Sequence, residues 1–264
     1  MKKRFAITIL LAAAAAIAVY FILSRKQNVF EYYQRHVKGR RTVSDVVNSY
    51  EPAVKARLKD YFERAKLPYL PDKITLIGLK CEKTLELWVE TGETAILLKK
   101  YAILGASGGA GPKLAEGDCQ VPEGIYRIES LNPNSLYHLS MKINYPNEFD
   151  RAKAAADKRT NPGGDIFIHG NKLSVGCIAI GDEAVEEVFV LSARAIKNGI
   201  KVIIMPFDMR INDNGSAGKN AAVNISPPWI GELYSSIRNE IVKYCIQGVQ
   251  LRAFARKRVE LRLY

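Results

Sequence analysis

The N-terminal part of the chain carries two different apolar patterns. From residue 5 to residue 23 every residue except Thr8 is apolar, and basic residues stand on both sides of this run. The layout is typical of an export signal, and the run approaches the roughly 20 residues that span a bilayer. We expect residues 1–26 to be a signal anchor or a signal peptide, and favour the anchor because a signal core is usually about 7–15 residues long. Residues 27–70 have apolar positions every three to four residues and predict a helical arm, kinked or split at Pro52.

From residue 71 to residue 208 the pattern changes to short apolar runs, which are typical of strands. One helix interrupts them over residues 182–198, where Asp182 is placed to cap the first turn. A polar stretch broken by prolines and glycines, residues 146–164, predicts a loop that acts as a lid, with a short surface helix at 148–158. The expected strands are residues 74–77, 84–89, 95–104, 125–128, 135–141, 165–169, 177–180 and 201–206.

These patterns predict the α+β fold class. The β-rich core occupies residues 71–208, with the helical arm before it and a basic helical extension, residues 209–264, after it. The length of 264 residues suffices for one sizeable core or two small ones. Hydrophobic residues make up 48% and charged residues 25%, which excludes a mainly disordered chain or a polytopic membrane protein.

The charge balance favours an anionic partner. The chain has 39 Lys and Arg residues against 27 Asp and Glu residues, a formal net charge of +12. Nucleic acid, acidic lipid or an acidic polymer would suit this charge, but an export signal argues against nucleic acid. We expect a periplasmic or otherwise extracytoplasmic protein, anchored in the inner membrane by residues 5–23. A cytoplasmic protein that binds nucleic acid is the competing hypothesis.

The cysteines do not indicate a metal site, and we expect neither a metal nor an organic cofactor. Cys81, Cys119, Cys177 and Cys245 are too irregularly spaced for a zinc site, and the chain has no Cys-x-x-Cys pair. In an exported domain a disulfide between Cys81 and Cys119 is one option. The glycine-rich segment 105–111 lacks the Gly-Lys-Ser/Thr ending of a phosphate-binding loop, which favours a loop at the rim of a site.

One histidine and one cysteine are spaced for nucleophilic catalysis. His169 ends an expected strand and Cys177 begins the next one eight positions later, so a tight connection brings them close. A catalytic cysteine needs a neighbouring base, usually histidine. Gly170 and Gly176 flank the connection, where tight turns or close approach of a substrate need glycine. The amides around Gly176 and Cys177 are placed to serve as oxyanion donors, and Ser174 can hydrogen-bond the loop or a substrate. A buried structural cysteine is the alternative at this point.

The run from His169 to Cys177 resembles the signature of the YkuD-type L,D-transpeptidases, a His-Gly pair followed by Ser-x-Gly-Cys. Further segments are similar to the YafK/DpaA branch of that family, which includes peptidoglycan diaminopimelate–protein amidases. The resemblance covers about residues 70–208 and implies a β-rich L,D-transpeptidase core. The segments similar to the branch are Gly111-Pro112-Lys113, Glu116-Gly117-Asp118, residues 122–126 and residues 135–151.

The resemblance implies a catalytic role for three residues. Cys177 would be the nucleophile, forming a thioester with a peptide carbonyl. His169 would be its general base and later the acid for the leaving amine. The main-chain carbonyl of Gly170 would orient the imidazole, as a side-chain acid does in a triad.

The resemblance also implies a substrate, with contacts from His138, Ser174 and Gly176. This substrate is the peptidoglycan stem peptide, attacked at the bond that follows the L-centre of diaminopimelate. Water as acceptor gives hydrolysis, for example release of a wall-linked lipoprotein, and an amine gives a crosslink. Many family members carry arginine two residues after the cysteine, whereas this chain has Ala179, which favours cleavage over crosslinking. A non-catalytic module that binds the cell wall is the alternative function.

Overall fold

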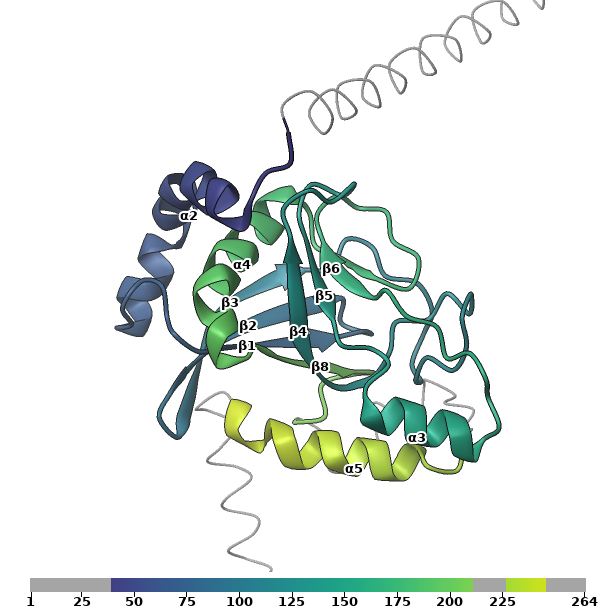
Figure 1. The fold of residues 1–264 in the computed structure, drawn as a ribbon. Coiled ribbons are helices and arrows are strands. Elements are labelled where there is room, and N and C mark those ends of the chain that lie inside the picture. Colours follow the sequence, from purple (N-terminus) through teal and green to yellow (C-terminus); the bar gives the residue numbers. More distant parts are fainter. Residues whose placement is uncertain (1–38, 211–226, 246–264) are drawn as a thin grey trace, which may run out of the picture. The chain divides into compact units, whose positions relative to one another are not determined.

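The computed structural model describes residues 39–210 and 227–245, where eight strands form one mixed sheet (Figure 1). The strands are β1 (Ile74–Leu79), β2 (Thr84–Thr91), β3 (Thr94–Ala102), β4 (Gly124–Asn132), β5 (Ser140–Ile143), β6 (Phe167–His169), β7 (Ile178–Ala179) and β8 (Lys201–Met205). Their order across the sheet is β3-β2-β1-β8-β4-β5-β6-β7. Neighbours are antiparallel except for β1 with β8 and β6 with β7.

The two ends of this strand order meet. Three residues after the end of β3, Gly105 forms an antiparallel bridge with Ala179 of β7. The Ala179 N–H donates to the Gly105 carbonyl at 2.8 Å, and the Ala179 carbonyl accepts the N–H of Leu104 at 2.8 Å. The sheet is therefore curled, and its last strand is hydrogen-bonded on both edges.

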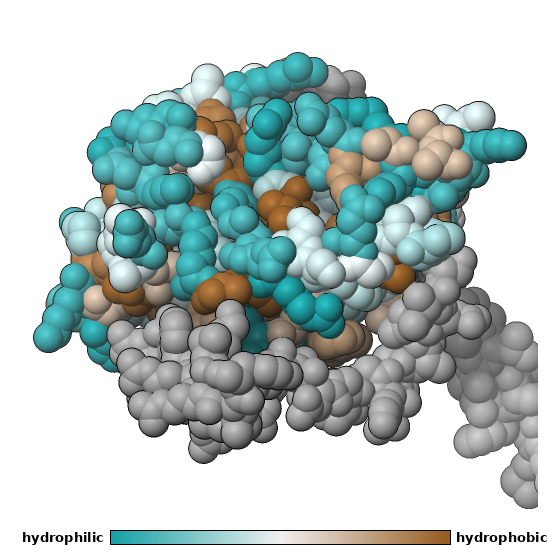
Figure 2. Space-filling model, turned by 90° about the horizontal axis from the view of Figure 1, so that it is seen from below, coloured by the Kyte–Doolittle hydropathy of each residue, from teal (hydrophilic) through white to brown (hydrophobic). Residues whose placement is uncertain are grey.

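Helices cover both faces of the sheet. On one face lie α2 (Val43–Ala65) and α4 (Asp182–Ala195), which is followed by the 3-10 turn η1 (Ile196–Asn198) (Figure 1). On the other lie α5 (Ile230–Ile241) with the turn η2 (Val242–Tyr244), and α3 (Glu148–Ala156) packs beside α5. The described surface on this second side is mostly hydrophilic, with small hydrophobic areas (Figure 2).

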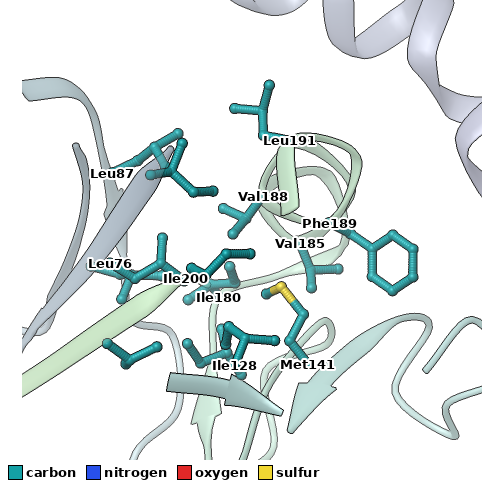
Figure 3. Close-up of a cluster of buried hydrophobic side chains, with 14 of the residues drawn as sticks. Leu76, Leu87, Ile128, Met141, Ile180, Val185, Val188, Phe189, Leu191 and Ile200 are labelled. Carbon is teal, nitrogen blue, oxygen red and sulfur yellow. The ribbon is translucent and has the colours of Figure 1, made fainter. Parts of the chain in front are cut away.

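The alternation of apolar residues along β1 explains the two layers. Ile74 and Leu76 pack with α2 and α4, whereas Ile77 and Leu79 pack with α5, so every residue of the strand is buried. Val185 and Val188 of α4 lie over the sheet in the first of these clusters (Figure 3). The helices thus meet a sheet that is apolar on both sides.

The observed elements confirm the α+β class and most of the expected strands. Helix α2 runs through Pro52 without a break, so the predicted split is wrong. The expected strand at 135–141 is also wrong, because the strand begins only at Ser140. Before it the backbone turns: the Asn132 and Ser135 side chains accept backbone N–H groups two residues ahead, and His138 has a left-handed φ of 70°.

The predicted N-terminal signal or anchor, residues 1–26, lies outside the described residues, as do the start of the helical arm and most of the C-terminal extension. Among the residues that the structure describes, no helix is long and apolar enough to cross a membrane. The described helix of the arm is α2, and the described helix of the extension is α5.

A buried carboxylate joins the two helices on the first face to the sheet. Glu187 of α4 accepts hydrogen bonds from Arg57 of α2 at 2.9 Å and from Lys99 of β3 at 2.7 Å. The Tyr101 hydroxyl of β3 also donates to it, at 3.0 Å. Glu187 therefore has a partner for each oxygen, and its removal would leave two cations without their shared anion.

We predict that Glu187→Ala lowers the free energy of unfolding by about 2 kcal/mol, because Lys99 loses its carboxylate partner, whereas Arg57 keeps Glu186. Urea denaturation measures the change. Glu183→Ala, on the exposed side of the same helix, is the control and should shift stability by less than about 0.5 kcal/mol. Equal effects of the two substitutions would contradict this account.

Asp150 in the first turn of α3 predicts a pH dependence of stability. Burial raises the pKa of its carboxyl to about 6, although the Asn147 N–H and the Tyr126 hydroxyl hydrogen-bond to it. The folded state therefore holds this proton more tightly than the unfolded state does, and the resulting stabilisation is lost as pH rises through 6. We expect the stability of the native chain relative to Asp150→Asn to fall by about 2 kcal/mol between pH 4 and pH 7. Denaturation of both proteins at each pH tests this, and a pH-independent difference would refute it.

Candidate active site

His169 lies at the end of β6 with its imidazole held in one orientation. The residue is 2% exposed, and its Nδ1 lies 2.6 Å from the carbonyl oxygen of Gly170. Because a carbonyl oxygen only accepts, Nδ1 carries the proton and Nε2 is left as the basic nitrogen. Burial lowers the pKa of the imidazole, and the hydrogen bond to Gly170 opposes this shift. The ring is therefore neutral near pH 7 and able to accept a proton at Nε2.

Gly170 has no room for a side chain. A Cβ there would lie 2.6 Å from Oδ1 of Asp182 and 2.7 Å from the carbonyl oxygen of Tyr137. Its N–H donates to the Leu139 carbonyl at 3.1 Å, which extends the pairing of β5 with β6. The glycine thus lets three segments converge behind the imidazole.

Cys177 precedes β7 directly and lies beside β6, the strand that ends at His169. In the parallel register Ile168 faces Ile178 and His169 faces Ala179, so Cys177 is level with Phe167. Its thiol lies against the backbone edge of β6, two residues before His169.

The Cys177 thiol is half-buried and bonded to the backbone of the neighbouring segment. Its Sγ accepts the Phe167 N–H at 3.4 Å and donates to the Asp165 carbonyl at 3.7 Å. No hydrogen bond joins it to His169 in the described part of the chain. Burial raises the pKa of the thiol, which the Phe167 N–H and the charge of Lys113 partly offset. In this resting arrangement the sulfur is protonated near pH 7.

The connection between the two residues, 170–177, is hydrogen-bonded to α4 and to the segment after β3. Asp182 accepts the Asn171 N–H at 2.7 Å, so it does not cap α4, whose N-cap is Gly181. The sequence-based assignment of Asp182 as the cap is therefore wrong, because its carboxylate is used by the loop. The Gly176 N–H donates to Ser107 Oγ at 2.7 Å, so this amide is not free to bind an oxyanion in the resting site.

Ser174 in this connection has a buried hydroxyl without a partner among the described residues. Buried polar groups are nearly always hydrogen-bonded, so an unpaired hydroxyl calls for an external partner such as water or a ligand. Its position between His169 and Cys177 is consistent with a contact to a bound peptide.

His138 is bonded to the helices on the first face of the sheet. Its Nε2 lies 2.9 Å from Oε1 of Glu186 in α4, and Tyr50 of α2 packs edge-on against its ring. No hydrogen bond brings it to His169 or Cys177 within the described ranges. The neighbouring Tyr137 instead reaches the site, with its ring centroid 4.6 Å from that of His169. Tyr137 was not identified from the sequence. A strand was expected here with His138 facing the site, and in a strand Tyr137 would then point to the opposite face.

The predicted lid, residues 146–164, contains the expected short helix, α3. It is held by contacts on two sides, one toward α5 and one toward the site. Toward α5, Lys153 pairs with Glu232 at 2.5 Å and Phe149 packs edge-on against Trp229. Toward the site, the Tyr145 hydroxyl donates to the Pro162 carbonyl at 2.8 Å. The segment leads directly to Asp165, whose carbonyl accepts the thiol of Cys177.

The remaining cysteines and acidic residues form no other centre in the ranges that the structure covers. Cys81 and Cys119 are free and exposed, so the disulfide considered for them is not formed. No group of three or more His, Cys, Asp or Glu side chains is placed to hold a metal ion among the described residues.

Comparison with known proteins gives one consistent result. Residues 80–204 match the family model of the YkuD L,D-transpeptidase catalytic domain. "Putative L,D-transpeptidase YafK" of Escherichia coli K12 is 38% identical over 135 residues, covering 49% of this chain and 52% of that protein. The chain thus spans about half the length of the curated relatives it matches.

Two solved structures are also similar to part of the chain. The helical cell shape determining protein Pgp2 of Campylobacter jejuni aligns with a TM-score of 0.43 and 22% identity, over 52% of this chain and 49% of that one. Bd1075 of Bdellovibrio bacteriovorus aligns with a TM-score of 0.38 and 23% identity, over 53% and 50% of the two chains.

We predict that alkylation of Cys177 by iodoacetamide accelerates steadily from pH 6 to above pH 9. The reason is that burial keeps the thiol protonated and the adjacent imidazole neutral, while the thiolate is the reacting species. Mass spectrometry of the peptide that contains Cys177 gives the rate at each pH, and the exposed Cys119 serves as the internal control. A rate that is already constant between pH 6 and pH 8 would indicate a resting thiolate and contradict this assignment.

Proposed function

Because residues 80–204 belong to the YkuD family of L,D-transpeptidase catalytic domains, we propose that this chain is a cysteine enzyme acting on peptidoglycan stem peptides, with Cys177 as nucleophile. The observation that supports it most is the register of β6 and β7, which brings the Cys177 thiol against β6 two residues before His169. The bond from Nδ1 of His169 to the Gly170 carbonyl also supports it, since it leaves Nε2 as the base.

The reaction begins with both groups uncharged. Nε2 of His169 takes the thiol proton as Sγ of Cys177 attacks the peptide carbonyl. The imidazolium then gives this proton to the leaving amine, and the acyl group stays on sulfur as a thioester. Water or a second amine attacks the thioester in the last step. The Phe167 N–H, which already points at Sγ, favours the negative charge that develops there.

We place the reaction at the carbonyl of the L-centre of diaminopimelate, and favour water as the acceptor. Ala179 stands where many family members have an arginine, and it is fully buried. Its backbone is bridged to Gly105, and a Cβ on Gly105 would lie 3.4 Å from that of Ala179. A cation to hold the carboxylate of a second stem peptide does not fit at this position, which supports cleavage over crosslinking.

The surface near the site favours a leaving group with apolar side chains. Leu136, Leu173 and Val175 are 60%, 74% and 74% exposed. Leu173 and Val175 lie in the connection between His169 and Cys177, and Leu136 precedes Tyr137, whose ring lies against that of His169. Stem peptides offer little apolar surface, whereas exposed apolar side chains usually mark an interaction site. We therefore propose that the substrate is a stem peptide carrying a polypeptide, such as a wall-linked lipoprotein. The expected extracytoplasmic location, with residues 5–23 as a membrane anchor, would give the enzyme access to it.

A non-catalytic module that binds the cell wall is the alternative. It would use the same surface but would have no need of a thiol and an oriented imidazole on neighbouring segments. Turnover therefore separates the two hypotheses, whereas binding alone does not.

We predict that the full chain removes a peptide remnant from stem peptides and that Cys177→Ala abolishes this reaction, because the proposed acyl intermediate forms on the Cys177 sulfur. The substrates are tetrapeptide muropeptides, crosslinked dimers, and stems that carry the remnant, with products identified by mass spectrometry. Cys119→Ala is the matched control and should keep full activity, since the Cys119 thiol is exposed and donates to the Gly117 carbonyl, away from His169 and Cys177 in its hydrogen bonding.

Three other results would change the proposal. New dimers or exchanged terminal residues would make the enzyme a transpeptidase. Binding without any product in both proteins would favour the wall-binding module. Activity that survives in Cys177→Ala would exclude Cys177 as the nucleophile.

A further inference from the structure

The segment after β3 lies directly against the connection that carries the site. The backbone of Gly105 comes so close to this connection that a Cβ would lie 2.2 Å from the carbonyl oxygen of Lys172. Two residues further on, Ser107 Oγ accepts the N–H of Gly176 at 2.7 Å. The contact spans 69 residues of sequence and ends one residue before Cys177.

The Gly176 N–H depends on this serine. Gly176 is buried and has a left-handed φ of 79°, which turns the chain into Cys177. Its N–H has no other acceptor among the described residues. A buried N–H that loses its acceptor carries a substantial free-energy penalty. Without the Ser107 hydroxyl, the turn at Gly176 would reduce this penalty by moving the N–H toward water.

The loop that carries Ser107 is itself held by hydrogen bonds to Gln120 and Glu123. The Gln120 side chain accepts the Gly109 N–H and donates to the Gly111 carbonyl, both at 3.0 Å. The Gly111 N–H donates to Glu123 at 2.7 Å, and this carboxylate is paired with Lys80 at 3.0 Å. Both members of that ion pair are buried, so the loop that presents Ser107 rests on the interior of the domain.

We infer that Ser107 is a positioning residue for Cys177, acting through its hydrogen bond to the Gly176 N–H. It sets the turn that holds Sγ against the backbone of Phe167 and Asp165, on the strand that ends at His169. This inference rests on the proposed role of Cys177, but it concerns the resting position of the thiol and can be tested without a substrate.

The test compares Ser107→Thr with Ser107→Val in the full chain. The two side chains have nearly the same shape, and only threonine keeps the accepting hydroxyl. The first readout is the pH profile of Cys177 alkylation, measured by mass spectrometry. With valine we expect the profile to move about one pH unit lower and the rate at pH 7.5 to rise about tenfold, because a released turn exposes the thiol to water. With threonine we expect the native profile.

The second readout is turnover of the peptide-bearing muropeptide. We expect kcat to fall about 10- to 100-fold with valine and KM to change less than about threefold, because a displaced nucleophile loses rate more than binding. Threonine should restore kcat. Ser235→Ala, which removes an exposed hydroxyl on α5, is the control and should change neither readout.

Equal alkylation profiles for the valine and threonine variants would overturn the inference, whether both match the native protein or both depart from it. If valine prevents folding, Ser107→Ala replaces it in the same comparison. If the native chain has no turnover, the proposed function fails, yet the alkylation profiles still decide the role of Ser107.

Discussion

The two-residue strand β7 is hydrogen-bonded on both of its edges, and the site depends on this double pairing. On one edge it is in parallel register with β6, and on the other Ala179 bridges Gly105 beyond β3. Since Cys177 directly precedes β7, this register sets its level relative to His169. A slip by one residue would move Cys177 away from Phe167 and Asp165, whose backbone groups hold its thiol. A two-residue strand forms too few hydrogen bonds with one neighbour to hold its register. Closure of the curled sheet supplies hydrogen bonds from a second neighbour, the segment at Gly105.

The hydrophobic core and the site are linked through the start of α4. Asp182, the first residue of that helix, accepts the Asn171 N–H, and its Oδ1 lies 2.6 Å from where a Cβ of Gly170 would be. Three to six residues further along, the helix is anchored by Glu187 and by apolar residues packed on the sheet. The position of the loop therefore follows from the docking of the helix, and the glycine is required because the carboxylate occupies the space behind the imidazole.

The sequence was informative where the chemistry is local and uninformative where it depends on distant contacts. The spacing of His169 and Cys177, the buried strands and the short helix after Pro146 could all be predicted from neighbouring residues. The strand expected at residue 135 failed because side-chain turns at Asn132 and Ser135 compete with extended backbone. Nothing in the periodicity indicated Ser107, whose partner is 69 residues away, or the stacking of Tyr137 on His169. The first contact exists only once the sheet has curled, and the second only once β5 has paired with β6.

Burial shifts the pKa values of the two reacting groups in opposite directions, and both shifts favour the neutral form. It raises the pKa of the Cys177 thiol and lowers that of the His169 imidazole, so both are neutral at rest. A resting ion pair would need more charge stabilisation than the Phe167 N–H and Lys113 supply, particularly since Asp165 opposes the thiolate. Proton transfer therefore has to accompany attack on a bound carbonyl. A protonated thiol is a poor target for oxidants and other electrophiles, so this arrangement protects Cys177 until a substrate is in place.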